Sequence, residues 1–127
     1  MEETEEDFKR YYKKLVENIK WLSLPFEKQK EYVPDFSDRP FEVLDGYMKA
    51  FVLLPQLIDN GYLSLEVISA LIRLHIFVDF TLCHPDFETM PEDKIDDFEN
   101  WIRLREMAKE TLKVMNEPEE APDSFYI

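Results

Sequence analysis

Apolar residues recur every three or four positions in four segments of the chain, and this helical spacing limits the fold more than any other feature. No segment shows the sustained alternation of apolar and polar residues that is typical of a half-buried strand. We therefore predict an all-α protein of one domain, the expectation for a chain of 127 residues. Most connections are short enough for antiparallel neighbours, which favours a small bundle of four main helices. The expected helices span residues 4–22, 41–60, 64–82 and 91–115.

Capping and helix-breaking residues mark the ends of these segments. Thr4 followed three residues later by Asp7 has the form of a capping box, which begins the first helix. Pro55 removes a backbone hydrogen bond inside the second segment, so we predict a kink or a restart there. Gly61 tolerates the left-handed conformation that follows a helix, and it predicts the end of that segment. Pro85 ends the third segment.

Residues 1–116 are expected to form the helical domain, and residues 117–127 an extended or flexible tail. The tail would be ordered if its last three residues, 125–127, found a groove. The helix at 64–82 is apolar nearly all round, which predicts a central position, with the ring of Trp101 buried against it. The predicted core includes Leu15, Ile19, Leu44, Phe51, Leu71, Ile72, Phe98, Ile102 and Ala108.

The chain carries 15 Lys and Arg against 28 Asp and Glu, a formal net charge of −13. Such a chain is repelled by phosphate backbones and anionic lipid, so we expect neither nucleic acid nor a membrane as its partner. A basic protein is the complementary partner. The N-terminus is acidic where a secretory signal has basic residues, and no stretch approaches the roughly 20 apolar residues of a membrane span. The prediction is a soluble, cytoplasmic protein.

Few residues carry a catalytic or metal-binding pattern. One cysteine and two histidines exclude a disulfide within the chain and the usual Cys/His zinc site. His75 and Cys83 would lie about 12 Å apart along a helix, which is too far for a thiol and its base. The two glycines cannot form a glycine-rich phosphate loop. We therefore expect no enzyme, no cofactor and no metal.

His84-Pro85-Asp86 matches the tripeptide that J-domain co-chaperones place between two helices. Those co-chaperones meet their partner with a basic face on the preceding helix, whereas the corresponding stretch here offers Arg73, Asp79 and two histidines. We interpret the tripeptide as a helix terminator in which Asp86 caps the next helix.

Seven carboxylates crowd residues 86–99, where Lys94 is the only cation. The cluster is explained either as the solvated start of the last helix, where the helix dipole favours carboxylates and Glu92 caps, or as a docking face. A basic partner would relieve the repulsion between like charges and bind faster through long-range attraction. If this face does not bind, the N-terminal acids of residues 2–6 and the aromatic tail are the next candidates. The predicted partner-binding residues are Asp86, Glu88, Glu92, Asp93, Asp96, Asp97 and Glu99.

Two stretches of the chain together form the layout on which a family resemblance rests. In residues 51–64 (FVLLPQLIDNGYLS) a kinked helix and a glycine stop lead into a long helix, and in residues 101–112 (WIRLREMAKETL) a Trp, an Arg, an Ala and a Leu follow at set intervals. Over about residues 41–115 the chain thereby resembles small all-helical bacterial immunity proteins, the antidotes of contact-dependent or polymorphic toxins. The resemblance implies a cytoplasmic, non-catalytic protein that binds and blocks a toxin delivered by a neighbouring cell. It carries over no site residues, because the contact faces differ from pair to pair.

Three functions are compatible with the sequence. The first is an immunity protein whose acidic surface fills the basic cleft of a nuclease-type toxin, with carboxylates in place of phosphates. The second is an adaptor or scaffold bundle that binds a cellular protein through Phe125-Tyr126-Ile127 or an exposed groove. The third is an enzyme or small-molecule sensor with a pocket among the aromatic residues of the first and third expected helices.

Overall fold

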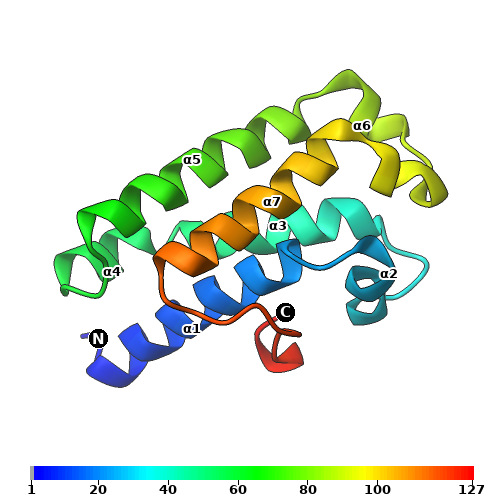
Figure 1. The fold of residues 1–127 in the computed structure, drawn as a ribbon. Coiled ribbons are helices and arrows are strands. Elements are labelled where there is room, and N and C mark those ends of the chain that lie inside the picture. The colour runs from blue at the N-terminus through cyan, green and yellow to red at the C-terminus, as the bar shows by residue number, and fades with distance from the viewer. Residues whose placement is uncertain (1) are drawn as a thin grey trace.

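Four long helices lie side by side and carry most of the core (Figure 1). The computed structural model describes residues 2–127 of the chain. α1 and α5 each pack against both α3 and α7. No residue from 2 to 127 is in a strand, which confirms the all-α prediction. The four helices are α1 (Glu5–Leu22), α3 (Arg39–Phe51), α5 (Leu65–Leu82) and α7 (Glu99–Val114).

Shorter elements interrupt the expected pattern of four helices. Over residues 2–127 the structure has seven α-helices, so it is a small helical domain with more breaks than the periodicity predicted. The three short α-helices are α2 (Phe26–Gln29), α4 (Leu54–Asp59) and α6 (Pro85–Thr89). Three 3-10 turns complete the fold: η1 (Lys30–Tyr32), η2 (Glu92–Asp97) and η3 (Ser124–Tyr126).

Most helix ends follow the local signals in the sequence. Thr4 and Asp7 form the predicted capping box at the start of α1. The second expected helix restarts at Pro55, which lies in the first turn of α4. Gly61 has a φ of 76°, and the N–H of Tyr62 donates to the carbonyl of Leu57 (2.9 Å), which closes α4 with a Schellman motif.

The expected helix at 91–115 is wrong in its first part. Residues Glu92–Asp97 form the 3-10 turn η2, Phe98 is extended, and α7 begins at Glu99. Glu92 does not cap a helix, because its carboxylate binds Arg39 at the start of α3. Side-chain contacts to distant elements therefore hold this segment in a separate turn.

Most of the predicted core is buried, with three departures. Phe51 is half-buried, and Ile72 and Ile102 are 42% and 43% exposed, so the placement of these two in the core is wrong. They lie on the outward faces of α5 and α7, where helical spacing alone does not distinguish an apolar surface residue from a core residue. The ring of Trp101 is buried as predicted, with the ring of Phe87 from α6 stacked on it at 6.0 Å.

The tail is neither free nor simply extended. It runs back along α1 and ends in η3 (Figure 1). The Asp123 N–H donates to Glu17 (2.8 Å), and the Asn18 side-chain amide donates to the carbonyl of Tyr126 (3.1 Å). The tail therefore packs on α1 through buried polar partners that periodicity does not reveal. None of the helices in residues 2–127 is long and apolar enough to cross a membrane.

Candidate functional site

The predicted acidic cluster lies at the end of the molecule that also holds α2 (Figure 1). It extends from α6 through η2 to the first residue of α7. The structure divides its seven carboxylates into two groups. Glu92 and Asp96 are half-buried and hydrogen-bonded, whereas the other five are exposed. We call these five the acidic end: Asp86, Glu88, Asp93, Asp97 and Glu99.

The two half-buried carboxylates have structural roles. Glu92 accepts hydrogen bonds from the Nε of Arg39 at 3.1 and 3.2 Å and also pairs with its Nη2. Asp96 accepts from the Nη2 of Arg105 and from the backbone N–H of Phe26 (3.4 Å). Both tie η2 to neighbouring elements, so neither is available to a partner without loss of these contacts. Their assignment to the partner-binding surface is not supported by this geometry.

The pair of Glu92 and Arg39 should make stability depend on acid. Hydrogen bonds from Arg39 outweigh burial and hold the pKa of Glu92 below its usual value of 4.5. A carboxyl with a lowered folded pKa stabilises the fold above the unfolded pKa, and this contribution is lost as the pH falls through the folded pKa. We expect wild type to lose more stability than Arg39→Met between about pH 5 and about pH 3. Urea midpoints from circular dichroism at both pH values measure this, and equal losses would contradict it.

An exposed aromatic ring lies close in sequence to the arginine that holds η2. Phe36 is 88% exposed and lies three residues before Arg39, which binds Glu92 of η2. Exposed aromatic rings supply contact area and exposed carboxylates supply charge complementarity, and both suit a protein partner. The described residues 2–127 contain no group of His, Cys, Asp and Glu side chains that could hold a metal ion.

The His84-Pro85-Asp86 tripeptide caps a helix, but not through Asp86. The Nδ1 of His84 accepts the backbone N–H of Asp86 (3.1 Å), so His84 is the N-cap of α6. His75 stacks on Phe51 with ring centroids 3.9 Å apart, and Cys83 is exposed. These residues therefore have separate surroundings, as the spacing along the helix predicted.

An apolar stripe runs along the outer face of α5. Its four members follow one another at intervals of seven, four and four residues, which places them on one face of the helix. The expectation that this helix is central is therefore corrected, because α5 has buried residues on one side only. Exposed apolar stripes of this kind mark interaction surfaces. The stripe consists of Leu65, Ile72, Ile76 and Phe80.

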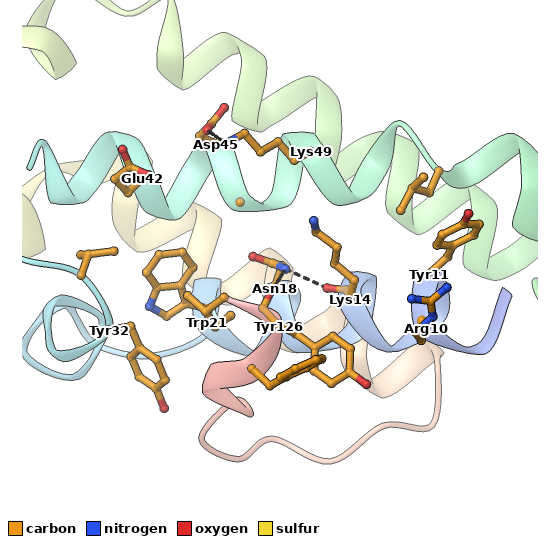
Figure 2. Close-up of a pocket in the computed structure, with 15 residues that line it drawn as sticks. Arg10, Tyr11, Lys14, Asn18, Trp21, Tyr32, Glu42, Asp45, Lys49 and Tyr126 are labelled. Carbon is orange, nitrogen blue, oxygen red and sulfur yellow. Dashed lines mark hydrogen bonds and ion pairs between the residues drawn. The ribbon is translucent and has the colours of Figure 1, made fainter. Parts of the chain in front are cut away.

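A cavity of about 550 Å³ lies between α1 and α3 and is bordered by the C-terminal turn (Figure 2). The sequence predicted a pocket between the first and third expected helices, but this one lies between the first and second. Aromatic and charged side chains line it together. The aromatic members are Tyr11, Trp21, Tyr32, Phe125 and Tyr126, and the charged members are Arg10, Lys14, Glu42, Asp45 and Lys49.

Asn18, labelled in Figure 2, lies against Gly46 of α3 in the cavity wall. The Asn18 side-chain amide donates to the carbonyls of Lys14 (2.8 Å) and Tyr126 (3.1 Å). A Cβ at Gly46 would lie closer than 3.0 Å to the Asn18 Oδ1 and 3.2 Å from the Trp21 ring. The sequence did not point to this cavity. Its one available signal was Gly46, since glycine inside a helix costs about 1 kcal/mol relative to alanine and requires a reason.

Comparisons with known proteins return nothing for this chain. No protein-family model matches it. No curated protein and no solved structure matches it. The likeness to immunity proteins therefore stays a prediction.

Proposed function

We propose that the protein is a non-catalytic antidote that binds a basic bacterial toxin domain through its acidic end. The observation that carries this proposal is the gathering of five exposed carboxylates at one end of the molecule. Within residues 2–127 the two arginines near them pair with Glu92 and Asp96, and no ion pair engages the five. Their charge is left for a partner.

Electrostatics supports a basic partner in two ways. The net charge of −13 attracts a cationic protein over long distances and raises the rate of encounter. At close range the carboxylates can occupy positions that substrate phosphates take in the cleft of a nuclease. Such a protein inhibits by covering the cleft, and it requires no catalytic group of its own.

The fold suits a role as a rigid antidote. In this proposal α1, α3, α5 and α7 act as a four-helix framework in the cytoplasm, and the acidic end is its recognition surface. Phe36 would supply an aromatic anchor at the rim of that surface, since buried aromatic residues contribute much of the binding energy in interfaces. The resemblance to small immunity proteins over residues 41–115 agrees with this reading.

Charge reversal at the acidic end should abolish protection. A variant with Asp86, Glu88, Asp93 and Asp97 replaced by Lys keeps Glu92 and Asp96, so the ion pairs of η2 remain. The proposal expects the cognate toxin domain to be encoded directly upstream, and we expect binding to that domain to weaken by roughly 100-fold or more, mainly through a slower association rate. Growth on co-expression and association rates at low and high salt measure this.

The matched control reverses four acids at the opposite end of the molecule, where α1 begins (Figure 1). Replacing Glu2, Glu3, Glu5 and Glu6 by Lys changes the net charge by the same amount and should leave protection intact. Circular dichroism checks the fold of both variants. Equal loss in the two variants would mean that charge acts without a defined site, and full protection by the first would exclude the acidic end.

The apolar stripe of α5 favours a second candidate, a non-catalytic adaptor that binds a cellular protein. The tail is less suited to that role than the sequence predicted, because Tyr126 and Ile127 are half-buried and Phe125 alone is exposed. The charge-reversal experiment separates the two candidates. An adaptor that binds through the apolar stripe keeps its partner when the acidic end is reversed.

A further inference from the structure

Four of the ten large hydrophobic side chains that are exposed in residues 2–127 belong to the apolar stripe of α5. They are 42–84% exposed, so no segment of the described chain covers them. α1 differs in this respect, because the C-terminal tail lies along it (Figure 1). The outer side of α5 is therefore an apolar surface that lacks a cover.

α3 extends this apolar surface on one side. Phe51 of α3 stacks its ring on His75 of α5, so this flank of α3 borders α5. The flank that contains Gly46 faces α1, since Gly46 lines the cavity there. Helical spacing places Phe41 and Val52, which are 41% and 69% exposed, nearer to the flank of Phe51 than to that of Gly46. The combined surface, which we call the apolar face, consists of Phe41, Val52, Leu65, Ile72, Ile76 and Phe80.

Little of the charge of the chain lies on α5. The helix has three charged residues among 18, Glu66, Arg73 and Asp79, which sum to −1. The acidic end lies beyond the C-terminus of α5, and the whole chain carries −13. A second copy of this chain can therefore pack on the apolar face if the pairing keeps the two acidic ends apart.

A twofold axis perpendicular to α5 meets this condition. It makes the two copies of α5 antiparallel, and the same patch then forms both halves of the interface. With Leu65 of one copy opposite Phe80 of the other, the isoleucines of both copies meet in the middle. The acidic ends then lie at opposite ends of the dimer, with the length of α5, about 27 Å, between them. Parallel pairing would place both acidic ends side by side, where their charges repel.

The apolar face is large enough for a dimer. α5 has 18 residues and α3 has 13, which corresponds to lengths of about 27 and about 20 Å. With a helix width of about 10 Å, the two helices present roughly 500 Å². Two copies would remove roughly 1,000 Å² from water, which is the lower size of a specific interface. A moderate affinity follows from this size.

We propose that the apolar face is the interface of a symmetric dimer of this chain, in which α5 packs antiparallel to α5 of a second copy. The acidic end stays free in each copy. The dimer therefore presents the acidic end twice, and its existence does not depend on the proposed antidote function.

Sedimentation equilibrium of the full chain measures the association. We expect a monomer–dimer equilibrium with a dissociation constant of about 10 μM or lower in about 0.15 M salt. Raising the salt from about 0.01 M to about 0.15 M should tighten the dimer about tenfold, because the Debye length falls from about 30 to about 8 Å and the charge on each copy is screened.

Two outcomes of sedimentation contradict the dimer. A chain that stays monomeric at about 500 μM in the higher salt overturns the proposal and leaves the apolar face to the partner of an adaptor. A dimer that weakens as salt is added is held by charge through another surface, and it overturns the proposal as well.

Variants locate the interface. Ile76→Lys should weaken the dimer by about tenfold or more, although it lowers the negative charge of each copy by one. Ile102→Lys makes the same change on the outward face of α7 and should change the dissociation constant less than about twofold. Equal losses in the two variants would overturn the assignment to the apolar face. Leu65→Lys, at a side chain 84% exposed, replaces Ile76→Lys if circular dichroism shows that the latter does not fold.

Cys83 reports the direction of pairing. It is the only cysteine of the chain, is exposed and caps the C-terminus of α5, so a nitroxide label can be attached without any substitution. With Leu65 opposite Phe80, the two Cys83 residues of the dimer lie roughly 30 Å apart along the helices. Double electron–electron resonance should show this distance. A distance below about 20 Å, which parallel helices would give, overturns the antiparallel interface.

Discussion

Replacing Lys20 by Met should lower the free energy of unfolding by roughly 3 kcal/mol. Lys20 is 3% exposed, and its ammonium lies 2.8 Å from Glu120 of the tail and 3.0 Å from Glu17, which is 2% exposed. Burial lowers the pKa of Lys20, but the hydrogen bonds to Glu120 and Glu17 outweigh it, and the pKa lies above its usual value. Methionine fills a similar volume and leaves Glu17 buried without its nearest cation.

Urea unfolding followed by circular dichroism measures this loss. Lys9→Met is the matched control on the same helix, because Lys9 pairs with the exposed Glu5 and Glu6 over 3.7–3.8 Å and should contribute little. Adding Glu17→Gln to Lys20→Met should restore part of the stability, since no buried charge then lacks a partner. A loss below about 1 kcal/mol for Lys20→Met would show that the tail does not hold Glu17 and Lys20 away from water.

Gly46→Ala should destabilise the protein by about 1–3 kcal/mol, although alanine is the better helix former by about 1 kcal/mol. The added Cβ would overlap Asn18 Oδ1, and Asn18 is held by two hydrogen bonds to carbonyls. α1 and α3 must then separate, or Asn18 must give up these bonds. The same urea titration measures the change.

A double-mutant cycle tests the cause. In an Asn18→Ala background Gly46→Ala should cost much less, because the overlapping oxygen is gone. Gly61→Ala is the control: its surroundings are open, so its cost arises from the φ of 76° and should be the same in both backgrounds. A Gly46→Ala variant more stable than wild type would exclude the close approach of the two helices.

Features that depend on neighbours in sequence were predictable. The capping box at Thr4, the restart at Pro55 and the stop at Gly61 all act through backbone groups within one turn of the residue itself. The helical class of the fold follows from the same spacing of apolar residues. The acidic end was also visible as a segment, because its carboxylates are close together in the chain.

The division of the seven carboxylates of residues 86–99 into structural and exposed ones was not predictable. Glu92 meets Arg39 across 53 residues, and Asp96 accepts from Phe26 across 70 residues. Nothing local separates these two from Asp93 and the other exposed acids. The late start of the last helix, at Glu99 and not at residue 91, has the same origin, since these contacts hold η2 apart from α7.

Local spacing and capping chemistry thus set the type and most boundaries of the helices, because hydrogen bonds and side-chain periodicity within a helix involve residues at most four positions apart. Contacts between distant elements set the rest: which apolar face stays exposed on α5, which carboxylates remain free, how the tail covers α1, and where Asn18 meets Gly46. Periodicity places a residue on a face of its helix, but the partner of that face depends on how the helices pack.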